Sequence, residues 1–131
     1  MRLDIDLLRH LLFEIEESDI PGEYTALKLE NAVKGFENKY GDNFEFVKNE
    51  HLYLLHEAKY VEAIVMDRAD GYKMVIVVKR TTWEGHNYLN SIRSSDVWSE
   101  IKTKIKSAGS YTIPVIQQIA ASLILKKTGL G

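Results

Sequence analysis

The stretch that decides the fold reads Thr81-Thr82-Trp83-Glu84-Gly85-His86-Asn87-Tyr88-Leu89-Asn90-Ser91-Ile92-Arg93. A Thr followed three residues later by a Glu, as in Thr81 and Glu84, is the capping-box pattern of a helix start. Residues 74–78 are all apolar, which predicts a strand just before this helix. Leu89 and Ile92 continue at helical spacing. We therefore expect a strand that runs directly into a capped helix.

Length and composition limit the class of protein. The chain has 131 residues, of which 45% are hydrophobic, enough for one domain with a buried core. The absence of cysteine excludes disulfides, thiolate zinc sites and cysteine nucleophiles, and it is typical of a reducing cytosol. Residues 1–6 include two acids, Asp4 and Asp6, where a signal peptide would be apolar, and the apolar run at 74–78 is too short to cross a bilayer. These features predict a cytoplasmic protein without membrane association.

Charge is distributed unevenly along the chain. Its net charge is −2, but residues 1–30 carry −5, residues 31–72 carry −3 and residues 73–131 carry +6. A basic second half can follow phosphate groups, or it can be a solvated face or pair with the acidic half. We prefer the solvated or paired interpretation.

Two or three helices are expected before residue 60. The first should start at Asp4 or Asp6, either of which can cap it, and should end by Ser18. Its apolar stripe consists of Ile5, Leu8, Leu11, Leu12 and Ile15. Residues 24–29 could form a short edge strand, and residues 31–40 a helix.

A further helix and a hairpin follow. Asp42 or Asn43 is expected to cap a helix that runs to about residue 58. Two β-branched runs, 60–66 and 72–78, surround an Asp-Gly turn and predict a β-hairpin. Because the second run is apolar throughout, we expect it to be covered on both faces.

The C-terminal part is predicted to be helical. One apolar stripe precedes Gly109, and Thr112 is expected to cap a last helix. That stripe consists of Val97, Trp98, Ile101, Ile105 and Ala108. The order of elements predicts a mainly helical α+β fold, with a winged helix-turn-helix core whose wing is the hairpin. Residues 1–94 would form this core and residues 95–131 a helical extension packed on it, as a single domain.

The sequence also resembles a family. The matching motif is Thr82-Trp83-Glu84-Gly85-His86, followed by Ile92-Arg93 and Val97-Trp98. Together with residues 51–63, it is similar to a small domain-of-unknown-function family common in bacterial prophages. The resemblance implies a winged-helix fold and a phage context, and no activity. This chain departs from the family at Lys59, where a turn glycine is usual, at Thr81, where a leucine is usual, and in a longer segment at 24–43.

No constellation for catalysis or metal binding is apparent. His51 and His56 are five residues apart, on nearly opposite sides of a helix. His51 is expected to be a hydrogen-bonded core residue, and His86 to tie its helix to the hairpin. Asp67 and Asp70 flank a turn glycine without the other ligands of a calcium loop. We expect a protein that is not an enzyme and that has no cofactor and no metal.

Nucleic-acid binding is the preferred functional hypothesis, as a regulator of phage or host genes. The helix before the hairpin would face duplex DNA with three exposed residues, with lysines at its edges and two cations on the hairpin. The candidate residues are Lys48, Asn49, Tyr53, His56, Lys59, Arg68 and Lys73. Glu50 and Glu57 oppose this reading, because residues 48–59 have no net charge when the histidines are neutral.

The alternative is a protein-interaction module without DNA binding, such as a phage-borne adaptor or inhibitor of a host protein. The acidic first helix and the surplus of apolar residues near the C-terminus favour it. Residues 112–127 could form a homodimer seam, or they could pack on the first helix.

Overall fold

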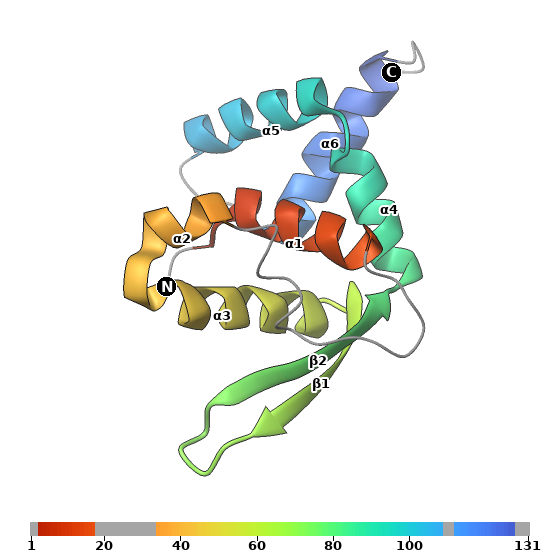
Figure 1. The fold of residues 1–131 in the computed structure, drawn as a ribbon. Helices are drawn as coiled ribbons and strands as arrows, with labels where there is room; N and C mark the ends of the chain where they lie inside the picture. The colour runs from red at the N-terminus through yellow and green to blue at the C-terminus, as the bar shows by residue number, and fades with distance from the viewer. Residues whose placement is uncertain (1–2, 18–33, 109–111, 128–131) are drawn as a thin grey trace. The chain divides into compact units, whose positions relative to one another are not determined.

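A computed structural model describes residues 3–17, 34–108 and 112–127 of the chain (Figure 1). The fold is α+β and mainly helical, as expected. The elements in chain order are α1 (Ile5–Glu17), α2 (Lys34–Tyr40), the 3-10 turn η2 (Gly41–Asn43), α3 (Phe44–Glu57), β1 (Val61–Asp67), β2 (Lys73–Thr81), α4 (Trp83–Ile92), α5 (Ser95–Ala108) and α6 (Ile113–Lys127). The chain divides into two compact units, residues 1–86 and 87–131, and α4 begins in the first and continues into the second. The predicted boundary at residue 94 stays a prediction.

Helix α1 is capped by Asp4, one of the two residues expected to cap it. Asp4 Oδ1 accepts a hydrogen bond from the Leu7 N–H at 3.1 Å, and the Asp4 carbonyl accepts one from the Leu8 N–H at 3.1 Å. The helix buries Ile5, Leu7, Leu8, Leu11, Leu12 and Ile15. The edge strand considered for residues 24–29, and the start of the helix expected from residue 31, lie outside the described residues.

The start of α3 differs from the prediction. Residues 41–43 form a 3-10 turn that leads directly into the helix, with the Phe44 N–H bonded to the Gly41 carbonyl. Asn43 therefore already has helical backbone angles, and its side chain makes no capping hydrogen bond. The expectation that Asp42 or Asn43 caps α3 is wrong, because this turn supplies the preceding hydrogen bond through the backbone.

A buried polar network joins α1, α2 and α3. The Nδ1–H of His51 donates to the Val47 carbonyl at 2.8 Å, and Nε2 accepts from the Asp4 N–H at 2.9 Å. Burial lowers the pKa of His51, which favours the neutral ring that these two bonds require. Burial alone would raise the pKa of Asp4, but hydrogen bonds from Tyr40 (2.5 Å) and Lys39 (2.9 Å), together with the Leu7 N–H, lower it. The prediction that His51 is a packed, hydrogen-bonded core residue is confirmed.

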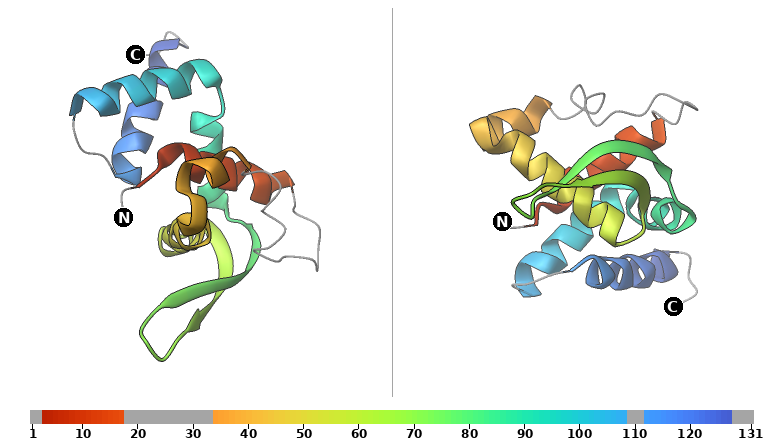
Figure 2. Two further views of the ribbon diagram at one scale, coloured as in Figure 1. Left: turned by 60° about the vertical axis from the view of Figure 1, so that its left-hand side comes forward. Right: turned by 90° about the horizontal axis from the view of Figure 1, so that it is seen from below.

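The predicted hairpin is present and longer than expected. Strands β1 and β2 are antiparallel, with Val61 opposite Thr81 at the base and Asp67 opposite Lys73 near the tip. The hairpin starts beside the C-terminal end of α3 and diverges from that helix towards its tip (Figures 1 and 2). Ile76 is 43% exposed, so the expectation that the second run is covered on both faces is wrong.

The start of α4 corrects the position of the expected cap. The cap is Thr82, whose Oγ1 accepts from the Gly85 N–H at 3.1 Å and whose carbonyl accepts from the His86 N–H at 2.9 Å. Thr81 is instead the last residue of β2 and is buried. The strand is longer than the apolar run because its ladder continues to the Val61–Thr81 pair, which moves the helix start by one residue.

Thr82 and His86 also connect the start of α4 to other parts of the chain. Thr82 also donates its hydroxyl to the Lys59 carbonyl at 2.6 Å and its N–H to the Tyr60 carbonyl at 3.0 Å, which ties α4 to the chain between α3 and β1. His86 Nδ1 lies 3.3 Å from Glu16 Oε2 on α1, so the expectation that His86 ties its helix to the hairpin is corrected.

The second unit contains the predicted cap and the predicted helical stripe up to Ile105; the side chain of Ala108, the last member of that stripe, lies outside what the structure describes. Helix α5 buries Val97, Trp98, Ile101 and Ile105, and α5 packs on α6. Thr112 caps α6, with its Oγ1 3.4 Å from the Val115 N and its carbonyl 3.0 Å from the Ile116 N. None of the helices within the described ranges is long and apolar enough to span a membrane. A homodimer through residues 112–127 stays a prediction.

Candidate interaction surface on helix α3 and the hairpin

Two of the predicted nucleic-acid contacts are buried. The Lys48 side chain is only 4% exposed; its Nζ lies 3.0 Å from Glu45 Oε2 and 5.7 Å from the centre of the Phe44 ring. Asn49 was expected on the exposed face of the helix but is 9% exposed. Both residues are therefore corrected from surface contacts to structural ones.

Asn49 connects α3 to the open edge of β2. Its Nδ2 donates to the Lys73 carbonyl at 3.0 Å, and its Oδ1 accepts from the Val75 N–H at 2.8 Å. A side-chain amide offers one donor and one acceptor side by side, as a backbone peptide group does, so it can satisfy a strand edge. The sequence could not indicate this role, because helical periodicity places a polar residue on the solvent side by default.

The two hairpin cations are exposed and already paired. Arg68 Nη2 lies 3.2 Å from Asp70 Oδ2, and Lys73 Nζ pairs with Asp67 Oδ1. The hydrogen bond with Asp67 raises the pKa of Lys73. A phosphate would have to compete with these carboxylates for both cations, which weakens the hairpin tip as a phosphate-binding element.

The last three candidates lie at the C-terminal end of α3. Tyr53 and His56 are half-buried, and their ring centres are 6.1 Å apart. Lys59 is exposed and has a φ of 65°, in the left-handed region. The Lys59 N–H bonds to the His56 carbonyl and the Tyr60 N–H to the Leu55 carbonyl, the Schellman arrangement that usually ends in glycine. This geometry explains why a turn glycine is the expected residue at position 59.

The outward face of α3 is acidic and aromatic. Phe46, Glu50, Tyr53 and Glu57 lie within about 60° of one another around the helix and are exposed or half-buried. The unit to which they belong, residues 1–86, has a net charge of −6, whereas residues 87–131 carry +4. This face therefore repels phosphate more than it attracts it.

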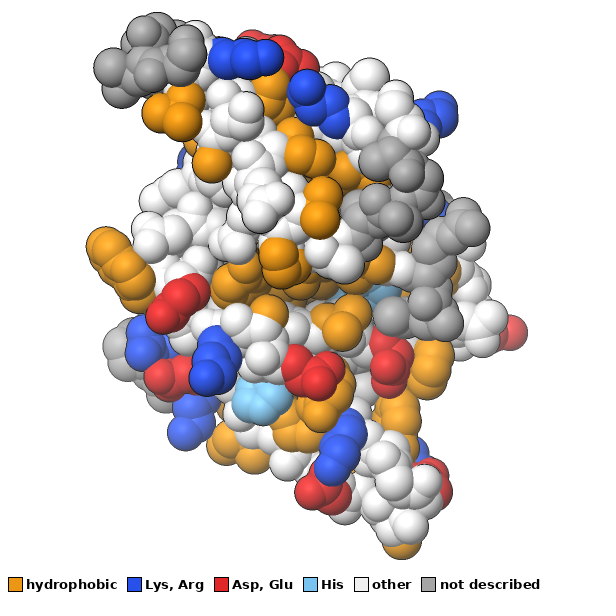
Figure 3. Space-filling model, turned by 180° about the vertical axis from the view of Figure 1, so that it is seen from behind, with side chains coloured by type: hydrophobic (Ala, Val, Ile, Leu, Met, Phe, Trp, Pro, Cys, Tyr) orange, Lys and Arg blue, Asp and Glu red, His pale blue; other side chains and the backbone are white. Residues whose placement is uncertain are grey.

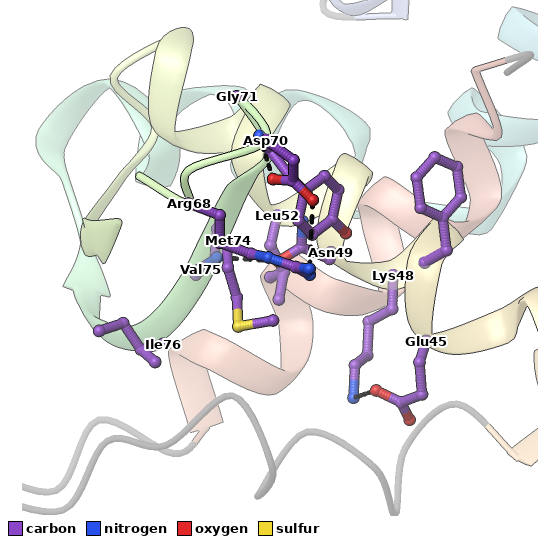
Figure 4. A pocket seen from close by; sticks show the side chains of 12 residues that line it. Glu45, Lys48, Asn49, Leu52, Arg68, Asp70, Gly71, Met74, Val75 and Ile76 are labelled. Atoms are coloured by element: carbon purple, nitrogen blue, oxygen red, sulfur yellow. Dashed lines mark hydrogen bonds and ion pairs between the residues drawn. The ribbon is translucent and has the colours of Figure 1, made fainter. Parts of the chain in front are cut away.

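A groove of ≈ 900 Å³ separates the N-terminal half of α3 from the hairpin (Figure 4). Its lining residues are Glu45, Phe46, Lys48, Asn49, Leu52, Arg68, Asp70, Gly71, Tyr72, Met74, Val75 and Ile76. The Phe46 and Tyr72 rings stack with centres 6.0 Å apart and planes at 18°. Charged lining residues are paired with each other, as Figure 4 shows for Lys48 with Glu45 and for Arg68 with Asp70. The groove is thus mainly apolar, and the charged residues that line it are already paired with each other.

Large apolar side chains are exposed along this surface. They are Phe46 (50%), Ile64 (43%), Met66 (44%) and Ile76 (43%). Only Ile76 belongs to the uninterrupted apolar run at 74–78, and that run predicts a strand covered on both faces. Within the described ranges, no group of three or more His, Asp or Glu side chains is arranged to hold a metal ion.

Comparison with known proteins identifies relatives. Residues 2–111 match a family model described as "Hypothetical protein (DUF2513)". An uncharacterized protein of Haemophilus influenzae is 30% identical over 125 residues, which cover 95% of this chain and 96% of that protein. No solved structure matches the chain. The similarity therefore extends over nearly the full length of both proteins.

Proposed function

The chain belongs to the DUF2513 family of hypothetical proteins, and we propose that it is a protein-interaction module that catalyses no reaction. Its groove between α3 and the hairpin binds a segment of another protein with apolar side chains flanked by Lys or Arg. In the phage context that the sequence resemblance suggests, the partner is a host protein and the chain acts as an adaptor or inhibitor.

The observation that carries this proposal is the apolar groove with its exposed rim. Leaving Phe46 and Ile76 about half exposed sacrifices hydrophobic stabilisation of about 25 cal/mol for each Å² left in water. A partner segment that covers the groove recovers it. The stacked Phe46 and Tyr72 rings offer a preformed aromatic contact, the residue type that dominates protein interfaces.

Charge selects the partner chemistry. Glu50 and Glu57 flank the aromatic residues on the outward face of α3, and the whole unit is acidic. An incoming segment with Lys or Arg beside its apolar residues gains from both features, whereas an acidic segment is repelled. The cations next to the groove are already paired: the buried Lys48 with the exposed Glu45, Arg68 with Asp70 and Lys73 with Asp67.

A defined probe tests the proposal. Two amphipathic synthetic helices of one length, one of Leu and Lys and the other of Leu and Glu, are titrated against the full chain by fluorescence polarisation. We expect saturable binding of the Leu/Lys peptide only. The double variant Phe46→Ser/Ile76→Ser should weaken that binding about tenfold or more.

A matched variant separates groove binding from general attraction. Val115→Ser changes an apolar side chain of the second unit that is 36% exposed, and it should leave the peptide affinity unchanged. Equal affinity for the two peptides, or equal loss in the two variants, would refute the groove as the binding surface. A partner captured from host lysate counts as support only if Phe46→Ser/Ile76→Ser loses it.

Duplex DNA is the second candidate ligand, favoured by one observation. Three helices, α1, α2 and α3, precede the hairpin, and this order supports a winged helix-turn-helix in which α3 and the wing contact DNA. The winged-helix fold is proposed here together with DNA binding. Titration of random duplex DNA at about 50 and 200 mM salt should then show binding with a shallow salt dependence, because few cations are exposed. No binding at the lower salt concentration would eliminate it.

A further inference from the structure

A second hollow lies at the base of the hairpin, where β1 begins and β2 approaches α4. Its volume is ≈ 360 Å³, and its lining residues are His56, Lys59, Val61, Glu62, Ala63, Lys79 and Thr82. We call it the hairpin-base hollow. None of these residues lines the α3–hairpin groove, so the two surfaces are separate.

Positive charge gathers at this hollow despite the acidity of its unit. Lys59 and Lys79 both line it, and both are exposed. The one lining carboxylate, Glu62, is paired with Arg80 at 2.8 Å, which compensates its charge. Figure 3 shows one face of the molecule, on which Lys and Arg side chains are interspersed with Asp and Glu side chains around a histidine. The hollow thus carries an excess of positive charge within a unit of net charge −6.

His56 brings a polar atom that lacks a partner. Its Nδ1 is buried and has no hydrogen-bond partner among the described residues. A buried ring nitrogen without a partner costs free energy, so such an atom usually meets a water or a ligand. His56 lines the hollow and is half-buried, so a turn of its ring would bring this nitrogen, as a donor, to an oxyanion in the hollow.

The start of α4 adds backbone donors next to the same residues. Thr82, which lines the hollow, is the N-cap, and its Oγ1 takes the Gly85 N–H. The N–H groups of Trp83 and Glu84 come before it in the first turn, where a helix leaves its N–H groups without an intrahelical acceptor. The dipole of α4 favours negative charge there, whereas the exposed Glu84 side chain and the C-terminal end of α3, beside His56 and Lys59, oppose it.

We propose that the hairpin-base hollow binds a phosphate-type oxyanion through Lys59, Lys79 and His56. Free phosphate, the phosphate of a nucleotide and the backbone of a nucleic acid share this chemistry. The exposed Trp83, beside the cap, offers a ring on which a base can stack if the phosphate belongs to a nucleotide. This site does not depend on the groove or on the partner proposed for it.

The test is a titration of the full chain with sodium phosphate, followed by amide NMR at ionic strength held constant with sodium chloride. We expect saturable shifts at Lys59, Lys79 and Thr82 to Glu84. The double variant Lys59→Gln/Lys79→Gln should lose affinity about tenfold. Lys104→Gln/Lys106→Gln removes the same charge from α5 and should bind as the wild type does. Circular dichroism verifies that both variants are folded.

The same variants identify the source of the oxyanion. Polarisation titrations use a nucleoside monophosphate, a single-stranded oligonucleotide and a duplex of equal length. Binding of either oligonucleotide below the concentration needed for inorganic phosphate assigns the site to a nucleic-acid backbone, provided that Lys59→Gln/Lys79→Gln weakens it. The proposal is overturned if inorganic phosphate gives no saturable shift, or if the two double variants bind with equal affinity.

Discussion

The base and the tip of the hairpin consist of the same two strands but are held in opposite ways. At the base, Val61, Val78 and Thr81 are buried, and Thr82 bonds to the backbone of Lys59 and Tyr60. Towards the tip, apolar side chains such as Met66 are over 40% exposed and the charged side chains form surface ion pairs, while Asn49 of α3 holds the backbone of β2 at Lys73 and Val75. The base therefore stabilises the fold, while the tip is available for binding. The following variants test this division, starting with the largest expected effect.

Gly85→Ala should have the largest effect on stability. A Cβ at this position would lie 2.0 Å from the Tyr60 carbonyl oxygen and 2.9 Å from its carbonyl carbon, and backbone cannot move aside without breaking the base. We expect a loss of about 3 kcal/mol in the free energy of unfolding, measured by urea denaturation. Gly35→Ala on α2 is the control, since no described atom lies within 4 Å of its added Cβ. It should be neutral or stabilising; equal losses in both variants would contradict the close contact at the base.

Thr82→Val keeps the shape of the side chain and removes its hydroxyl. The variant loses the acceptor for the Gly85 N–H and the donor to the Lys59 carbonyl. The expected cost is about 1–2 kcal/mol in the free energy of unfolding, followed by thermal or urea denaturation. A cost below a few tenths of a kcal/mol would show that Thr82 does not cap α4.

Thr81→Val should have the opposite sign although it changes the adjacent residue in the same way. The Thr81 hydroxyl is buried and has no hydrogen-bond partner among the described residues. Its removal should stabilise the protein by about 1 kcal/mol, because a desolvated polar group without a partner is replaced by a methyl group. Denaturation of Thr81→Val beside Thr82→Val measures both signs in one experiment. Destabilisation by both changes would contradict the assigned roles.

Lys59→Gly should stabilise by a smaller amount. Lys59 has a left-handed backbone, which costs a residue with a Cβ about 1 kcal/mol or more, while glycine adds disorder to the unfolded chain. The net gain expected in the free energy of unfolding is about 0.5 kcal/mol. Lys59→Gln keeps the Cβ and should show no such gain. A loss of stability in Lys59→Gly would indicate that the Lys side chain itself holds the base together.

Ile76→Val should have the smallest effect. Ile76 is 43% exposed near the tip, so the loss of one methylene group should change the free energy of unfolding by less than about 0.5 kcal/mol. A loss above about 1.5 kcal/mol would mean that the tip contributes to the core, and the distinction between base and tip would fail.

Local patterns predicted the elements well and their junctions less well. The α1 cap at Asp4, the stripe of α5 and the Thr112 cap each depend on residues within one or two helical turns. The α4 cap was misplaced by one residue, because both Thr81 and Thr82 suit a helix start. Which of them becomes the cap depends on how far β2 pairs with β1, a contact between distant residues.

The sequence by itself determined the mainly helical α+β class, the hairpin and the core position of His51. Only the tertiary structure decided which of the candidate nucleic-acid contacts are exposed and which are buried. From their polarity, Asn49 and Lys48 would be placed on the surface. In the structure, Asn49 hydrogen-bonds to the open edge of β2 and Lys48 pairs with Glu45. The physical reason is that periodicity records which residues share a face of a helix. What covers that face depends on elements far away in the chain, and so do the partners that a buried polar group finds there.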